Sequence, residues 1–193
     1  MDSRTPTTYD ELISQLTRVV RKLSYREGDF TLASGKKSKF YVDLKATTLH
    51  PDGAHLIGEA TYALLTQKGI AVEGVGGLTL GADPMATAVS LAARGHGKIW
   101  PAYIVRKEPK DHGTGRYIEG SENMKPGASV VVLEDVVTTG GSSIKAIERL
   151  RAEGYKPVAV ISVVDRQSGG AEAFAATGVP YYWLTTLSAV QNA

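Results

Sequence analysis

The feature that most constrains the fold is a repeated alternation between continuous apolar stretches and stretches with helical spacing. The apolar stretches occupy residues 70–77, 99–105, 128–135, 157–165 and 181–186. The helical stretches occupy residues 82–95, 141–154 and 171–178. Strands that are apolar without alternation are typical of a sheet covered on both faces. The pattern therefore predicts an α/β fold with a central, mostly parallel sheet flanked by helices.

The N-terminal part of the chain follows a different pattern. Apolar residues at helical spacing predict a helix over residues 9–23, and Thr8 followed by Glu11 matches a capping box at its start. Residues 28–44 predict two short strands joined by a turn, and residues 53–68 predict a second helix. We therefore expect a small separate element ahead of the sheet.

Length and composition limit the class of protein. With 193 residues, the chain is long enough for one domain with a sizeable core. We expect a single domain over residues 1–193, in which about residues 1–45 form the N-terminal element. The formal net charge of +2 is too small to indicate nucleic acid as the partner. The chain has no cysteine, which excludes disulfides and thiolate metal sites.

The distribution of apolar residues also indicates where in the cell the protein is expected. The N-terminal residues are polar and lack the apolar core of a signal peptide. No apolar run approaches the ~20 residues that a membrane-spanning helix needs. We expect a cytoplasmic protein that binds neither a membrane nor nucleic acid.

The segment VVVLEDVVTTGGSS, residues 130–143, carries the clearest chemical signal. Glu134 and Asp135 fall at the carboxyl end of a predicted strand, where ligands of open α/β sheets bind. Gly140 and Gly141 then lead into a helix N-terminus, whose exposed N–H groups favour an anion such as phosphate. Carboxylates would repel a phosphate but suit a sugar diol, a developing cation or a metal. The segment therefore predicts a site for a sugar phosphate.

The same segment has a simpler interpretation, which the residues alone leave open. It could be an ordinary strand-to-helix turn with a threonine cap and two solvated acids. It is not a P-loop, because the spacing GxxxxGK[ST] is absent, and it does not match GxGxxG.

A basic segment, residues 106–120, interrupts the alternation of strands and helices. It has neither helical nor strand periodicity, and it contains three glycines. Its cationic residues are Arg106, Lys107, Lys110, His112 and Arg116. Long irregular loops in compact domains are often functional, although a solvated basic turn is the alternative.

Five motifs in chain order resemble one known family. Residues 130–143 resemble the phosphoribosyl-pyrophosphate (PRPP) motif of the type I phosphoribosyltransferases. The sequence RKEPKDHGTG, in the basic segment, resembles the mobile catalytic loop of the orotate phosphoribosyltransferases. FTLASGKKSKFYVD, GVGGLTLGADPMA and VVDRQSGG are also similar to that family. The resemblance implies a type I phosphoribosyltransferase-like fold with an N-terminal hood.

The resemblance also implies an activity. The family transfers the 5-phosphoribosyl group of PRPP to orotate, giving orotidine 5'-monophosphate and pyrophosphate in pyrimidine synthesis. Mg²⁺ is the implied cofactor, bound mainly through PRPP and not directly by the protein, with Asp135 as a candidate contact. The implied assembly is a homodimer in which the basic segment reaches the other subunit's site.

Individual roles follow from the same resemblance. The implied catalytic residues are Arg106, Lys107, Lys110, His112, Glu134 and Asp135. The implied substrate-binding residues are Lys36, Phe40, Tyr41, Glu134, Asp135, Val136, Val137, Thr138, Thr139, Gly140, Gly141, Ser142 and Arg166. Arg166 suits the orotate carboxylate, because a guanidinium can pair with it through two bonds. A surface arginine paired with Asp165, and core packing by Phe40 or Tyr41, are the alternatives.

Two positions depart from several well-known bacterial members of the family. Ala33 and Leu80 stand where those members have lysines. Lys36 or Lys37 is the candidate replacement for the first lysine. Backbone N–H groups near Thr79 are the candidate replacement for the second.

Two other functions remain open at the level of sequence. A phosphoribosyltransferase for a purine base would share residues 130–143 but would need no arginine for a base carboxylate. A PRPP-sensing regulator that binds nucleic acid could share the fold, because a fold does not fix a function. The small net charge favours the enzyme, and so do the four cations that match the family's catalytic loop, which are Arg106, Lys107, Lys110 and His112.

Overall fold

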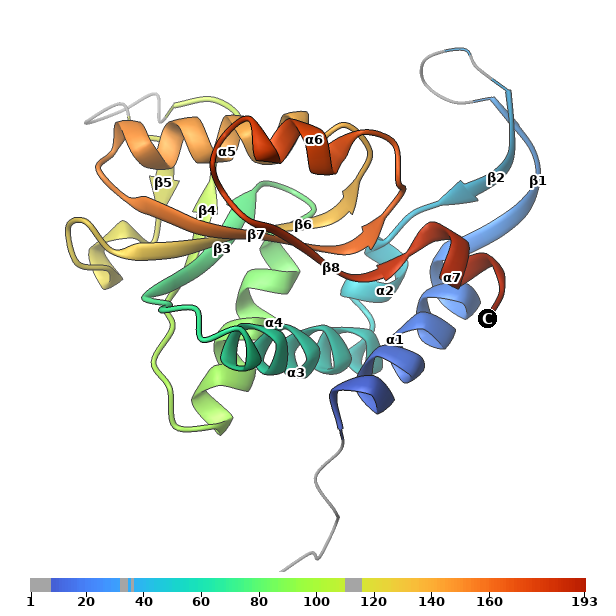
Figure 1. Cartoon of the computed structure of the whole chain (residues 1–193), viewed down its shortest axis with the longest axis horizontal. Coiled ribbons are helices and arrows are strands. Elements are labelled where there is room, and N and C mark those ends of the chain that lie inside the picture. The colour runs from blue at the N-terminus through green and yellow to red at the C-terminus, as the bar shows by residue number, and fades with distance from the viewer. Residues whose placement is uncertain (1–7, 32–34, 36, 110–115) are drawn as a thin grey trace, which may run out of the picture.

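The structure of the protein is a computed structural model that describes residues 8–31, 35, 37–109 and 116–193. A six-stranded sheet with strand order β5-β4-β3-β6-β7-β8 forms its centre (Figure 1). The strands are β3 (Gly74–Leu78), β4 (Ala102–Val105), β5 (Ile118–Glu119), β6 (Ser129–Val137), β7 (Lys156–Asp165) and β8 (Tyr181–Thr186). Only the β4–β5 pair is antiparallel within this described sheet. The predicted mostly parallel sheet is confirmed.

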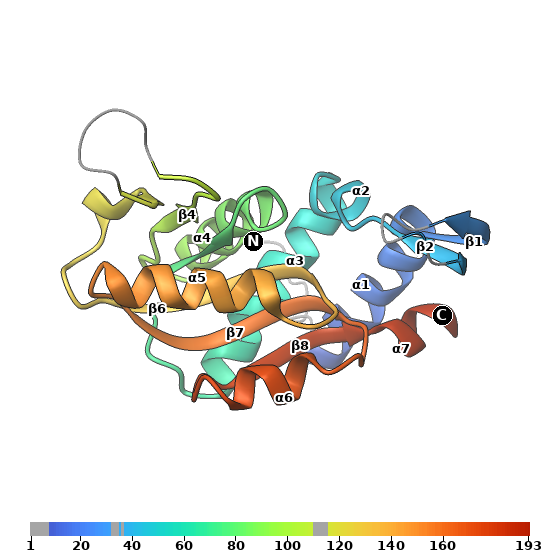
Figure 2. The same cartoon turned by 90° about the horizontal axis from the view of Figure 1, so that it is seen from above.

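Helices cover both faces of the sheet (Figures 1 and 2). One face carries α5 (Gly141–Ala152) and α6 (Gly170–Ala175), and the other carries α3 (Pro51–Gln67) and α4 (Asp83–Gly95). Within the described ranges, no helix is long and apolar enough to cross a membrane.

Strand β6 explains why the predicted strands lack polar alternation. Val131 and Leu133 pack into the core cluster that includes residues of α3 and α4. Val130 and Val132 point to the opposite face and join the cluster that includes residues of α5 and α6. Because successive side chains of a strand alternate between faces, both sets must be apolar when helices cover both sides.

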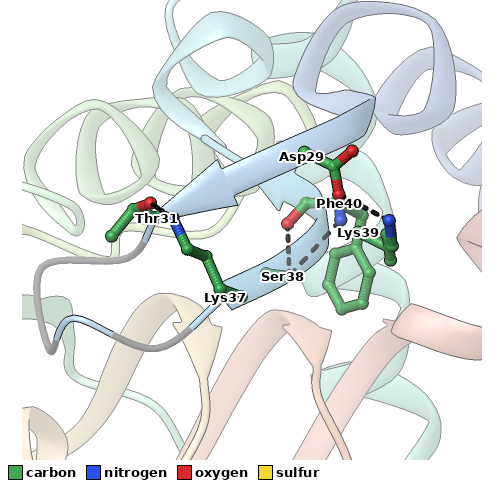
Figure 3. A network of polar contacts seen from close by, with 6 residues as sticks. All are labelled: Asp29, Thr31, Lys37, Ser38, Lys39 and Phe40. Atoms are coloured by element: carbon green, nitrogen blue, oxygen red, sulfur yellow. Dashed lines mark hydrogen bonds and ion pairs between the residues drawn. The ribbon is translucent and has the colours of Figure 1, made fainter.

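The N-terminal element combines a helix with a hairpin that projects from the body of the molecule (Figure 1). Helix α1 (Tyr9–Ser24) begins with the predicted capping box, in which Thr8 and Glu11 exchange hydrogen bonds. Strands β1 (Tyr25–Thr31) and β2 (Lys37–Val42) pair antiparallel. Polar contacts join the strands, among them Lys39 Nζ to Asp29 Oδ1 at 2.5 Å and Lys37 Nζ to Thr31 Oγ1 at 2.7 Å (Figure 3).

The structure differs from the sequence prediction in its short elements. The basic segment was expected to lack regular structure, yet it ends in β5, which adds an antiparallel edge to β4. Two residues are too few to show strand periodicity. Helices α2 (Lys45–Thr48) and α7 (Leu187–Gln191), and the 3-10 turn η1 (Ser121–Asn123), were also not predicted, for the same reason.

Candidate functional site

A cavity of about 230 Å³ lies at the carboxyl end of β6, where the predicted sugar-phosphate segment leads into α5. Its lining residues are Glu134, Val136, Val137, Thr138, Thr139, Gly140, Gly141 and Ser142. All eight are among the predicted substrate-binding residues. The structure therefore brings this part of the predicted site together around one space.

The turn into α5 has the geometry of an anion site. Gly140 precedes the helix with a φ of 79°, a left-handed conformation that favours glycine. A Cβ atom at Gly140 would lie 2.9 Å from the Phe174 ring, so a side chain there would also clash. The first N–H groups of α5 have no partner within the helix, and the helix dipole adds positive potential. Exposed hydroxyls of Thr138 and Thr139 stand beside them.

Glu134 lies at the inner wall of this cavity. Only 9% of the residue is exposed, and one carboxylate oxygen accepts a hydrogen bond of 2.8 Å from Ser143 Oγ. The pKa of Glu134 is raised to about 7, mainly because the carboxyl group is buried; the hydrogen bond from Ser143 lowers the pKa and the neighbouring charge of Asp135 raises it, and both are smaller effects.

Asp135 faces the loop between β3 and α4. A Cβ atom at Gly81 would lie 2.8 Å from the Asp135 carboxyl carbon, so the loop can approach this closely only with a glycine. Lys45 contributes a positive charge nearby, since the Asp135 carboxylate is one of the charges that raise the pKa of Lys45. The larger cause of that shift is the bond of 2.6 Å between Lys45 and Asp43.

The first residue of α4, Asp83, is a second acidic group near this loop. Thr79 Oγ1 donates a 2.7 Å hydrogen bond to Asp83 Oδ2. Asp83 Oδ1 is buried and, among the described residues, has no hydrogen-bond partner. Leu80 is 66% exposed and supplies no cation.

The carboxylates at this edge suit a magnesium ion held mainly by substrate. No group of three or more metal-ligating side chains occurs in the part of the chain that the structure describes. Mg²⁺ commonly binds through one or two carboxylates, waters and substrate phosphates. Asp135 and the unpartnered oxygen of Asp83 fit that mode, whereas a site built wholly from protein ligands does not fit these residues.

Arg166, at the end of β7, meets the hairpin. Its guanidinium carbon lies 5.7 Å from the Phe40 ring centroid, and its Nε is buried without a hydrogen-bond partner among the described residues. Among the ion pairs of the described residues, none joins Arg166 to Asp165. Asp165 Oδ1 instead accepts the Gln167 N–H at 2.9 Å.

The two aromatic residues of β2 have different environments. Phe40 packs against the main core and stacks on Tyr25, with ring centroids 5.8 Å apart. Tyr41 is 45% exposed and contacts Phe30. Core packing therefore applies to Phe40, which is also the ring that lies under Arg166.

The described ends of the basic segment lie next to α5. Lys107, Ser142 and Lys145 share a cavity of about 300 Å³ with Leu78, Glu108 and Arg149. Arg106 forms an ion pair of 2.9 Å with Glu119. Lys36, Lys110 and His112 lie outside the described residues, so their predicted roles stay predictions.

The sequence interpretation missed Lys45 and Lys145. Lys145 sits one turn into α5, and its spacing of three residues from Ser142 indicates a shared helix face. Lys45 carries no such signal, because its proximity to Asp135 depends on how α2 packs.

Three features together are typical of a type I phosphoribosyltransferase. They are a mostly parallel sheet, two acids followed by a turn that suits a phosphate, and basic residues beside that turn. Residues 82–176 match the family model described as a phosphoribosyl transferase domain. An orotate phosphoribosyltransferase of Nostoc sp. is 48% identical over 189 residues, covering 97% of this chain and 90% of the relative. The enzyme of that name from Aquifex aeolicus is 46% identical, with 90% and 94% covered.

Solved structures of orotate phosphoribosyltransferases also resemble this chain. The orotate phosphoribosyltransferase of Mycobacterium tuberculosis, in a complex with Fe(III) dicitrate, matches with a TM-score of 0.83 and 41% identity, covering 93% of this chain and 98% of that chain. The same enzyme in complex with PRPP matches with a TM-score of 0.79 and 37% identity, with 93% and 99% covered. The chain belongs to the orotate phosphoribosyltransferase family.

Proposed function

We propose that this protein transfers the 5-phosphoribosyl group from PRPP to orotate, giving orotidine 5'-monophosphate and pyrophosphate. A ring nitrogen of orotate loses its proton to solvent and bonds to C1 of the ribose as the C1–oxygen bond breaks, and pyrophosphate leaves with the bonding electrons. The observation that carries the proposal is the cavity between Glu134 and Ser142, which combines acids for a ribose with a turn for its phosphate. The curated relatives and the PRPP complex of a relative support it.

The ribose 5-phosphate would occupy the turn before α5. The residues from Thr138 to Ser142 would surround the phosphate with backbone N–H groups and hydroxyls. Glu134 and Asp135 would accept hydrogen bonds from the ribose hydroxyls. Their negative charge would also stabilise the positive charge that develops on the ring as pyrophosphate departs.

Orotate would bind between the hairpin and the end of β7. Its carboxylate would pair with the guanidinium of Arg166 through two charge-assisted hydrogen bonds. Phe40 would support the guanidinium from below and present an apolar face to the planar ring. We assign Tyr41 the role of contacting the base through its main chain.

The leaving pyrophosphate would be neutralised by the basic segment. Arg106 and Lys107 are its described cations, and Lys110 and His112 complete the proposed set. Mg²⁺ would add positive charge on the phosphates, with Asp135 and Asp83 as its protein contacts. The backbone near Thr79 would replace the lysine that several bacterial members of the family have at the position of Leu80. Lys36 remains the proposed replacement for the lysine missing at Ala33.

The proposed assembly is a homodimer in the cytoplasm. In the resembling family the basic segment serves the neighbouring subunit. In this chain, Lys107 shares a cavity with Ser142 of the same chain, so we propose that at least this lysine serves its own site. Analytical ultracentrifugation with and without PRPP tests the dimer, because it measures the mass of the assembly in solution.

A spectrophotometric assay tests the reaction. Orotate should be consumed when the purified protein, PRPP and Mg²⁺ are all present, whereas uracil, adenine and hypoxanthine should not react. Turnover with a purine alone would replace orotate by a purine as the substrate. No turnover, together with PRPP-dependent binding of nucleic acid in a gel shift, would favour the regulator.

A further inference from the structure

Helix α5 holds the first end of the basic segment through one side chain. The guanidinium of Arg149 donates from its two terminal nitrogens to the main-chain oxygens of Arg106 and Lys107, the second bond being 2.7 Å long. These carbonyls follow the last residue of β4, where the sheet no longer provides partners for them. Arg149 therefore fixes the main chain at the point where the proposed pyrophosphate cations begin.

The same helix also holds the other end of the segment. The Arg149 guanidinium carbon lies 4.3 Å from the centroid of the Tyr117 ring. Glu153, the C-cap residue that directly follows α5, accepts the Tyr117 N–H at 2.7 Å. The two ends also join each other, because the Arg106 N–H donates to the Tyr117 main-chain oxygen at 2.8 Å.

This helix begins at the proposed phosphate site. Gly141 is its first residue, and Arg149 lies eight residues later, about 12 Å along the axis. A helix of this length moves as a rigid element. The position of the turn before α5 is therefore fixed relative to both ends of the basic segment. Lys107 and Ser142 indeed line one cavity.

We propose that Arg149 and Glu153 are positioning residues that hold Lys107 in register with the phosphate site. This inference rests on the proposed function. A guanidinium is suited to the task because its planar fork donates to two carbonyls at once and stacks on an aromatic ring, whereas a lysine ammonium does neither equally well. Glu153 acts only as a hydrogen-bond acceptor, and the side-chain oxygen of a glutamine can accept the same bond.

The test compares substitutions on the same helix. Arg149→Met and Arg149→Lys should each lower kcat by roughly tenfold to 10²-fold, because small misplacements of catalytic groups cost that much. The KM for orotate should change little. Glu153→Ala should lower kcat as well, while Glu153→Gln should restore it. Arg151→Met is the matched control, since Arg151 binds Thr177 O outside the site and its loss should leave kcat unchanged.

Hydrogen exchange gives a readout that does not depend on the reaction. The amides of Arg106 and Tyr117 should lose protection in Arg149→Met, while the amides of β6 and α4 keep theirs. Unchanged exchange at Arg106 and Tyr117 would overturn the proposal, and so would loss of protection throughout the sheet. Equal activity of Arg149→Met and wild type would also overturn it. A wild-type protein that is inactive with orotate would instead contradict the proposed function.

Discussion

The guanidinium carbon of Arg166 lies 5.7 Å from the ring centroid of Phe40, so a cation at the end of β7 rests against the N-terminal hairpin. The contact continues into the hood, because Phe40 stacks on Tyr25 and the Arg21 guanidinium carbon lies 4.4 Å from the Tyr25 ring centroid. Four side chains from α1, the hairpin and β7 thus form one stack. The position of Arg166 therefore depends on the hood as well as on the sheet.

Replacing Arg166 by lysine should weaken orotate selectively. Lysine keeps the charge but cannot form a two-pronged pair with a carboxylate or stack its planar group on Phe40. We expect the KM for orotate to rise on the order of tenfold, since a lost charge-assisted hydrogen bond costs about 1.5 kcal/mol or more. PRPP binding, measured by calorimetry, should stay the same.

Arg94→Lys serves as the control for this substitution, because Arg94 is exposed on α4. This substitution should change neither the KM for orotate nor the affinity for PRPP. A loss of PRPP affinity in Arg166→Lys, with orotate binding intact, would contradict the assignment of the base site.

Replacing Gly81 by alanine should reduce the affinity for PRPP. The new Cβ would lie 2.8 to 2.9 Å from the carboxyl group of Asp135, so this group or the loop must shift. We expect the Kd of PRPP to rise on the order of tenfold, because a displaced carboxylate loses its charge-assisted bonds to the ribose. The measurement is calorimetric titration with PRPP and Mg²⁺.

Gly95→Ala is the matched control, since nothing lies within 4 Å of the position where its Cβ would be built. This change should leave PRPP binding unaltered and stabilise the fold by about 0.5–1 kcal/mol, because alanine favours a helix. Identical PRPP affinities for the two variants would count against the contact between Asp135 and the ribose.

Replacing Glu134 by glutamine should change how stability depends on pH. Burial raises the pKa of this carboxyl from 4.5 to about 7, so between these values the folded chain binds the proton more tightly than the unfolded chain does. The contribution of Glu134 is therefore fully present below pH 4.5 and is lost as the pH rises through 7. Glutamine has no charge to bury, and its side-chain oxygen can still accept the hydrogen bond of Ser143.

Chemical denaturation at several pH values measures this difference. Glu134→Gln should match the wild type near about pH 4.5 and exceed it by on the order of 1–3 kcal/mol near about pH 8. Glu148→Gln, on the exposed face of α5, should follow the wild-type profile. A constant difference between Glu134→Gln and wild type across this range would show that burial does not govern the protonation of Glu134.

The sequence predicts the sheet and the glycine turn before α5 because their signals are local. Val130 to Leu133 must be apolar on both sides of the strand, and Gly140 must precede the helix in a left-handed conformation. The roles of Lys45 and Arg149 could not be predicted in this way. Each acts on a segment distant in the chain, and neither forms a pattern with its neighbours.

Replacing Lys107 by alanine should lower the rate of turnover much more than the affinity for orotate. The charge that Lys107 would neutralise grows on the pyrophosphate as the bond to C1 breaks, so its contribution is largest in the transition state. We expect kcat to fall on the order of 10²-fold, as when one preorganised donor is removed from an active site. Steady-state kinetics with orotate varied at saturating PRPP and Mg²⁺ separates kcat from KM. Lys98→Ala, an exposed lysine outside the site, should leave both constants unchanged. A rise in the KM for orotate with kcat preserved would assign Lys107 to ground-state binding and remove it from the proposed chemistry.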